Sequence, residues 1–497
     1  MRRWILTCFA IVMGITSVQG REVIQLTLES AVDVAINNSY RTKMLALEID
    51  RSIFYLRARK ASLHTQAYMR LKSPDLQNIS DHKWNSNLGR EEIVRVNSTL
   101  WQSDLSVLQP LILFGYPTNG YLSLNYRIYQ YEQRDNGQRD YDLYNRLYLK
   151  FEQPLFLPNE LKNDLEEAEL NLRDVKLDYI SERVEIIENI ADDYYDIFEL
   201  SYYETIHEKH LDILNEVLQE TKLLAADDSN RDIESTQIEL EISNATENLL
   251  STQSILRRRL ADLKQRLRLP LEDSLYVTPQ VNIVPITVDL DQAIEMGYNN
   301  SPWLKRLAIR KRRSEIDVQD AKGRNAFHMT VEMTYGLEKK NHSFYSLWDE
   351  FDNSNSLTLN AYIPLWDGGV RNNRIQAEMT DLARRDLEIQ REQEDIHKDI
   401  VNSYTNLKEF YQRAVNMQNS VRLSKEVTQS SIQQYANGQI SLQDLIQIIN
   451  RNRETEEKFL QIYVDYRRSL LELSRETYYN YEKNISLIEE FDLVYEE

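Results

Sequence analysis

Two long stretches of the sequence, residues 159–269 and 370–437, contain neither glycine nor proline. Apolar side chains within them recur every three or four positions, which is the spacing of one face of an α-helix. They include Val184, Ile187, Ala191, Tyr194, Phe198, Ile400, Tyr404, Leu407 and Tyr411. At about 1.5 Å per residue, a helix over the second stretch is on the order of 100 Å long. We therefore expect these helices to line an elongated structure, with the tyrosines packed in its wall.

Each stretch also carries a signal for reversal of the chain. Residues 227–230 are two aspartates, a serine and an asparagine, which favour turns and caps over helix interiors. In the second half, residues 435–445 read YANGQISLQDL, and Gly438 is the only glycine after Gly369. Glycine adopts positive φ without strain, so we expect Gly438 to form a turn. Two antiparallel helical hairpins are predicted, at about 159–269 and about 370–478.

An internal repeat relates the two halves of the chain. Residues 27–52 align without a gap to residues 289–314 at an offset of 262, and both segments contain Asn-Asn-Ser. Two unrelated amphipathic helices would share leucines and alanines by chance, but not easily a triplet that ends one helix and caps the next. We infer a first structural repeat at 21–280 and a second at 281–480, followed by a C-terminal tail at 481–497.

Alternation of apolar and polar residues predicts two strands in each repeat. In the second half, Met329, Val331 and Met333 alternate with threonine and glutamate, and a further alternating run ends in Ile363-Pro364-Leu365-Trp366. The expected strands lie at about 65–72, 145–157, 329–337 and 355–365. The inserted region 73–140 has no counterpart of that length in the second half, and it is expected to form an extra hairpin with polar loops.

The first 20 residues have the plan of a secretory signal peptide. A basic pair, Arg2 and Arg3, precedes an apolar run from Trp4 to about Val12, and cleavage is expected after Gly20. The apolar run is shorter than the ~20 residues of a spanning helix. The single cysteine, Cys8, lies in this segment. The mature chain is therefore expected to have no disulfide, thiol nucleophile or thiolate metal site.

Net charge and hydropathy restrict the partners. The formal net charge is −20, so a phosphate backbone would be repelled and no nucleic acid is expected. No later run of about 18 apolar residues follows, so a membrane would have to be crossed by strands. Four strands cannot close a barrel, which needs at least about eight. Three copies of the chain would supply twelve strands and, beside them, twelve long helices.

The two halves resemble the outer-membrane efflux protein family, the TolC-like channels. The resemblance covers about residues 24–480. Its motifs are the paired openings Leu28 to Asn38 and Leu290 to Asn300, the strand ends QPLF (153–156) and IPLW (363–366), helices that carry Tyr194 and Tyr404, and YANGQISLQDL before a long closing helix. Each motif alone is weak, but their order, which occurs twice, is specific.

The resemblance implies a mostly α, α+β fold with a duplicated helix-strand-strand-helical-hairpin repeat. It implies a homotrimer whose 12-stranded β-barrel lies in outer-membrane lipid of a Gram-negative bacterium and is continued by a long α-helical barrel in the periplasm. Such channels are passive ducts for efflux or type I secretion. A periplasmic adaptor (membrane fusion protein) and an inner-membrane transporter are the implied partners.

The resemblance also places functional residues at the turn around Gly438. Gly438 and Ser441 fall on the hairpin tip that contacts the adaptor, Tyr435 falls on a tyrosine that holds the entrance shut, and Asp444 falls on the first acidic position of the pore ring. The family's tip arginine is replaced by Ile440, and its second acidic residue by Gln447, so a gate here would depend more on packing. Alternatively, Asp444 is only a solvated charge in the first turn of a helix, where negative charge is favourable.

No motif indicates an enzyme. HEKH (207–210) has its histidines three positions apart, so it is not HExxH, and we expect a solvated helix face there. No catalytic, cofactor-binding or metal-binding residue is assigned, and no cofactor is expected. A structural coiled-coil envelope protein without pore activity is the main alternative to a channel, although it would not need a duplicated pair of strands. A secreted helical hydrolase has no supporting motif.

Overall fold

The computed structural model describes residues 23–85, 89–135, 138–225, 231–270, 274–278 and 280–488. It has two compact units. Unit 1 contains residues up to Lys43, Ile180–Ser301 and residues from Glu394 onward, and unit 2 contains Met44–Tyr179 and Pro302–Gln393. Each unit takes segments from both sequence repeats, so the repeats are interleaved and are not separate domains. The expected signal peptide lies outside the described residues.

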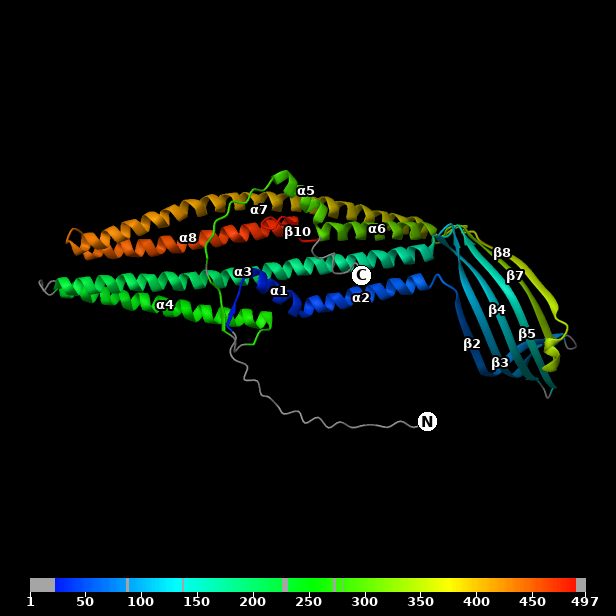
Figure 1. The fold of residues 1–497 in the computed structure, drawn as a ribbon. Helices are drawn as coiled ribbons and strands as arrows, with labels where there is room; N and C mark the ends of the chain where they lie inside the picture. The colour runs from blue at the N-terminus through cyan, green and yellow to red at the C-terminus, as the bar shows by residue number, and fades with distance from the viewer. Residues whose placement is uncertain are drawn as a thin grey trace, which may run out of the picture. The chain divides into compact units, whose positions relative to one another are not determined.

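Eight α-helices in the described residues repeat in order and in length (Figure 1). The first four have 11, 22, 66 and 37 residues, and the second four have 11, 22, 67 and 36. They are α1 (Leu28–Asn38), α2 (Tyr40–Ala61), α3 (Glu160–Ala225), α4 (Arg231–Leu267), α5 (Leu290–Asn300), α6 (Pro302–Gly323), α7 (Val370–Ala436) and α8 (Leu442–Thr477). No helix in this part of the chain is both long enough and apolar enough to cross a membrane.

The long helices pair as antiparallel hairpins within unit 1. Along α3 and α4, Lys222 pairs with Glu239 at 2.8 Å, and Asp193, further from the turn, pairs with Arg266 at 2.7 Å. Figure 1 shows α3 beside α4 and α7 beside α8. The first turn was expected at residues 227–230, which lie outside the described residues.

The repeated asparagines hold the short opening helices against the ends of the hairpins. The Asn38 side-chain amide donates to the carbonyl of Leu267 at 3.0 Å, at the end of α4. In the second half, the Asn300 amide donates to the carbonyl of Thr477 at 3.1 Å, at the end of α8. The last carbonyls of a helix have no partner within it, so each asparagine satisfies one of them. This explains why the duplicated sequence carries asparagine at both positions.

The core of unit 1 lies where the first short helix meets the long ones. One cluster of buried side chains joins α1, α3, α4 and α8, including Ala31, Phe198, Leu263 and Leu460. Tyr194 packs against this cluster, with its ring 5.5 Å from that of Tyr195 in a T-shaped arrangement. Two short parallel strands pair with each other: β1 (Val23–Gln25) comes directly before α1 in the sequence, and β6 (Ser274–Tyr276) comes directly after α4.

Unit 2 contains one antiparallel sheet of six strands in the order β2-β3-β4-β5-β7-β8 (Figure 1). The strands are β2 (Gln66–Asn85), β3 (Arg90–Leu113), β4 (Tyr116–Asp135), β5 (Gln138–Leu155), β7 (His328–Asn341) and β8 (Asp352–Tyr362). The sequence predicted four strands from the two repeats and an extra hairpin from region 73–140. The described part of that region forms β3, β4 and parts of β2 and β5 within the same sheet, so the sheet is larger than the four strands expected for it. A 3₁₀ turn, η1 (Tyr345–Trp348), precedes β8, and a small pair, β9 (Tyr479–Asn480) with β10 (Ile485–Ser486), follows α8.

The sheet has one apolar and one polar face. Leu105, Tyr126, Leu147 and Leu337 stand opposite one another across β3, β4, β5 and β7, on one face. The neighbouring residue on each of these strands points to the other face and is charged. Asp104 accepts a hydrogen bond from Arg127 at 2.5 Å, and the side chain of Arg146 lies 3.4 Å from the carboxylate of Glu338. Period-two alternation therefore separates apolar from charged residues across four strands.

Candidate functional site

The turn at Gly438 ends α7 with a Schellman motif. Gly438 has φ of +72° and its N–H donates to the carbonyl of Tyr435 at 2.9 Å, while the N–H of Gln439 donates to Gln434 at 2.8 Å. These two bonds satisfy carbonyls that the end of a helix leaves unpaired, and the left-handed residue of this motif, here Gly438, is usually glycine. The sequence around Gly438 therefore reverses the chain for a local, well-defined reason.

Helix α8 begins with a side-chain cap. Ser441 is the N-cap residue, and its hydroxyl oxygen accepts from the N–H of Asp444 at 3.2 Å. The same hydroxyl donates to the Asp444 carboxylate at 2.6 Å. Asp444 is exposed in the first turn of α8, as is Gln447 one turn later. The local role of Asp444, a charge that favours the helix N-terminus, is thus present in the single chain.

Tyr435 lies inside the tip and not on its surface. The side chain is only 3% exposed. Its hydroxyl donates to the Glu234 carboxylate at 3.0 Å and shares a hydrogen bond of 2.9 Å with the hydroxyl of Thr221. Thr221 lies near the end of α3 and Glu234 near the start of α4, so Tyr435 links the second hairpin to the first.

Apolar side chains surround this link. The buried cluster at the tip contains Leu214 and Val217 of α3, Ile238 and Ala245 of α4, and Leu442, Leu445 and Ile449 of α8. Ile440, in the position where the resembled family has arginine, is partly buried against this cluster. The tip is therefore held by packing around one hydrogen-bonded tyrosine.

The partners of Tyr435 were missed at the sequence level. Glu234 lies in the first turn of α4, as Asp444 lies in the first turn of α8. Aligning the two helical hairpins by their starts, as the opening helices were aligned, brings these two carboxylates into correspondence. That alignment was the available signal, although it does not show that Glu234 turns toward Tyr435.

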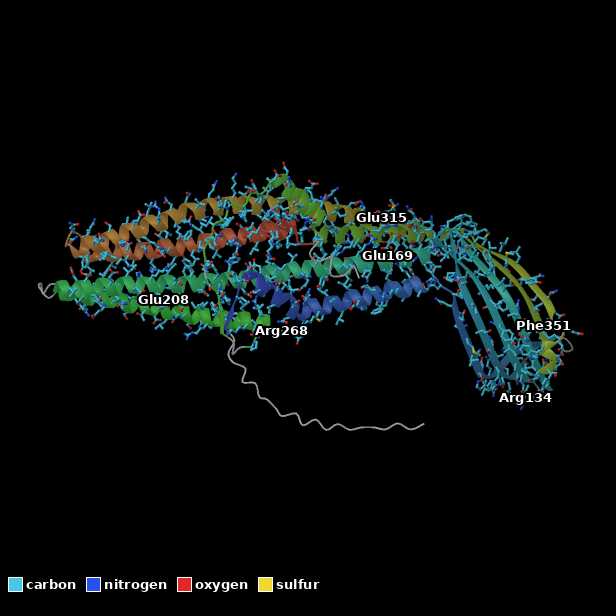
Figure 2. The ribbon with its side chains drawn as sticks, viewed as in Figure 1. Arg134, Glu169, Glu208, Arg268, Glu315 and Phe351 are labelled. Atoms are coloured by element: carbon cyan, nitrogen blue, oxygen red, sulfur yellow. The ribbon has the colours of Figure 1, made fainter. Side chains whose placement is uncertain are left out.

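HEKH does not form the solvated face that was expected. His207 and His210 are 9% and 7% exposed, whereas Glu208, labelled in Figure 2, and Lys209 are exposed. Burial, with Arg453 and His207 adding to it, lowers the pKa of His210 to about 4. The helical phase explains the error, because three residues return to nearly the same face of α3.

A pocket of about 470 Å³ lies beside His210, between α3, α7 and α8. Its polar lining includes Asn452 and Glu456, both buried, and the Glu456 carboxylate pairs with Lys425 at 3.3 Å. Among the residues that the structure describes, no group of three or more histidine, cysteine, aspartate or glutamate side chains is arranged to hold a metal ion. The pocket thus offers polar contacts between helices.

Comparison with solved structures shows that 90–99% of this chain superimposes on outer-membrane channels and an outer membrane protein. The Campylobacter jejuni CmeC outer-membrane channel superimposes with a TM-score of 0.63 at 13% identity, covering 99% of this chain and 97% of that one. The outer membrane protein VceC of Vibrio cholerae gives 0.64 at 12% identity, covering 90% and 95%. The Neisseria gonorrhoeae MtrE outer-membrane channel, in its open state, gives 0.60 at 10% identity, covering 90% and 88%.

The chain has the fold of these outer-membrane channels. No family model and no curated protein matches the sequence. At 10–13% identity the likeness is one of fold, and it extends over nearly the whole of each chain. In this channel fold, the tip residues Tyr435, Gly438, Ser441 and Asp444 lie together at the turn between α7 and α8.

Proposed function

We propose that this protein is the outer-membrane channel of a tripartite efflux or type I secretion system. Three copies form a passive duct across the periplasm, with the sheets in outer-membrane lipid. An inner-membrane transporter drives export, and a periplasmic adaptor joins the two. The observation that carries the proposal is the match of 90–99% of the chain to outer-membrane channels, helices and sheet included. The two-faced sheet supports it, because an apolar face suits lipid and a polar face suits an aqueous lumen.

The contacts at the turn between α7 and α8 support the assignment of a closed entrance, because they hold the two hairpins of one chain together. Tyr435 joins the two hairpins through Thr221 and Glu234, and apolar side chains enclose it. Opening the entrance by separating the hairpins must break these contacts. Tyr435 is therefore assigned to gating, and three copies of exposed Asp444 are assigned to a cation-attracting ring at the entrance.

Conductance in planar bilayers tests the channel. Purified trimers of the wild type are compared with Tyr435→Phe, which removes both hydrogen bonds and keeps the ring. Two hydrogen bonds of about 1 kcal/mol net each contribute about 2 kcal/mol, so we expect the open probability to rise roughly thirtyfold. Tyr404→Phe, a half-buried tyrosine elsewhere on α7, is the control and should leave it unchanged.

A structural coiled-coil envelope protein is the competing function. It would bind envelope partners but conduct no ions. If trimers carrying Tyr435→Phe never open pores in any bilayer tested, the channel proposal is wrong and the structural role is favoured.

Adaptor contact is assigned to the exposed residues of the turn, Gly438 and Ser441. Both are exposed, and neither is needed to fill the buried cluster around Tyr435. A cysteine placed at Ser441 tests the contact through cross-linking to a periplasmic adaptor. A cysteine at Glu454, exposed further along α8, should not cross-link.

A further inference from the structure

The sheet of unit 2 has two open edges in the described part of the chain. Strand β2 pairs with β3 on one side only, and β8 pairs with β7 on one side only. An edge strand presents a row of unpaired N–H and C=O groups, which is a template for another strand. In lipid, such groups must be paired, because the hydrocarbon offers no water to satisfy them.

The exposed apolar face continues to both edges. On β2, Met69 and Leu71 are 61% and 66% exposed, and on β8, Leu357 and Leu359 are 64% and 60% exposed. The residues between them across the sheet, such as Leu149 at 44%, are exposed on the same face. On this face β8 carries no charged side chain, and neither does the first part of β2, which precedes Pro74 and the bulge between Lys72 and Asp75. These two segments therefore lack the charges that protect a free edge, and each is open to pairing with another strand.

Strand direction determines which edges fit together. Every neighbouring pair in the sheet is antiparallel, and the number of strands is six, so β2 and β8 run in opposite directions. Strand β8 of one copy can therefore pair antiparallel with β2 of the next copy while the apolar faces stay on one side. This head-to-tail contact also keeps the helices of all copies on the same side of the membrane. Repeated around an axis, it closes a ring.

Strand length agrees with this pairing. Strand β8 has 11 residues, which matches the 9–11 residues of a tilted transmembrane strand. Strand β2 has 20 residues, so its first part can pair with β8 while the rest continues beside β3. Near the other end of β8, Leu347 of η1 is fully buried and accepts from the Asn145 amide, so η1 covers that part of the same face.

We propose that β8 of each copy pairs with β2 of the next, and that all six strands of the chain form the barrel wall. The proposal rests on the trimeric channel proposed above. Six strands in each of three copies make eighteen, in place of the twelve expected from the sequence. Strands β3 and β4 are then wall strands, and not an external hairpin. Because barrel diameter grows roughly linearly with strand number, the lumen is about 1.5 times as wide as that of a twelve-stranded barrel.

Cysteine cross-linking tests the pairing of β8 with β2. Full-length Cys8→Ser protein receives Leu357→Cys together with Ala67→Cys, Met69→Cys or Leu71→Cys, because the register between copies must be sampled. We expect at least one pair to give disulfide-linked dimers and trimers in the membrane. Facing residues at non-hydrogen-bonded positions of an antiparallel pair have the closest Cβ atoms, and these approach the roughly 3.5–4.5 Å that a disulfide needs.

Controls separate the alternatives. Leu149→Cys with Tyr335→Cys, which face each other within one sheet, should cross-link within the chain only. If pores form but no β2 pair links to Leu357→Cys, the proposed interface is wrong while the channel stands. Dimers from Leu357→Cys alone would show two-fold pairing of β8 with itself, which also overturns the proposal. If neither pores nor trimers form, the channel itself fails.

Labelling tests whether β3 and β4 are in the wall. Leu124→Cys on the apolar face of β4 should be protected from a water-soluble maleimide in the membrane, with labelling reduced at least tenfold relative to Gln77→Cys in the outer part of β2. Both side chains are exposed in the single chain, so a difference reports the lipid. Equal labelling of the two positions in pore-forming trimers would place the β3–β4 hairpin outside the wall and overturn the count of eighteen.

Discussion

At the scale of residues, the tip shows how one short segment combines local and long-range roles. Gly438 turns the chain because it adopts positive φ, and Ser441 starts α8 because its hydroxyl caps the helix. Tyr435, three residues before the glycine, instead reaches two residues of the other hairpin. Asp444 serves the local cap and is also exposed for a role at the entrance.

Asp444→Asn separates the charge from the cap. The amide oxygen still accepts from the Ser441 hydroxyl, so the helix start is retained while three charges leave the proposed ring. We expect block of the pore by a multivalent cation to weaken by roughly an order of magnitude. Glu454→Gln is the matched control. Unchanged block in Asp444→Asn trimers would remove this residue from the constriction.

His210 gives the helices a predictable pH dependence. Burial lowers its pKa from 6.5 to about 4, so the folded protein excludes a proton that the unfolded chain binds. The free energy of unfolding is therefore complete above about pH 6.5 and falls as the pH drops toward 4, by up to about 1.4 kcal/mol per pH unit. Urea unfolding at several pH values should show this slope, reduced in His210→Gln. Exposed His397, changed to Gln, should not reduce it.

At the scale of elements, the internal duplication of the sequence explains the order and lengths of the helices better than helix propensity does. Each half builds helices of almost the same lengths in the same order. The opening helix of each half is fastened to the returning helix by the same residue type, Asn38 in one and Asn300 in the other. Equivalent contacts in both halves mean that each half-structure is stabilised in the same way.

Asn38→Ala and Asn300→Ala should have similar effects. Each removes one hydrogen bond to the carbonyl end of a long helix, so each should lower the free energy of unfolding by about 1 kcal/mol. The two bonds share no partner, so the double variant should lose about twice as much. Urea unfolding of detergent-solubilised protein measures this. Exposed Asn37 and Asn299, changed to Ala, are controls, and an equal loss there would show that the hydrogen bonds are not responsible.

At the scale of the whole molecule, the main departure from expectation is that the strands of the inserted region join the same sheet as the repeated strands. Alternation at Leu122, Leu124, Tyr126 and Ile128 indicated a strand in the inserted region, but not the sheet to which it belongs. The described part of residues 62–159, which connect α2 to α3, carries four strands, whereas residues 324–369, which connect α6 to α7, carry two. The insertion therefore enlarges the sheet and leaves the helical part of the repeat unchanged.

The sequence by itself determined the elements whose causes are local. Absence of glycine and proline predicted the long helices, Gly438 predicted a turn, and the ordered motifs predicted the channel fold, which the structural likeness to CmeC and VceC confirms. Only the tertiary structure decided which residues meet: Tyr435 with Thr221 and Glu234, the HEKH histidines with the interior, and β3 and β4 with the sheet. The reason is physical, because local periodicity shows that a face is apolar, whereas its partner depends on packing between segments far apart in the chain.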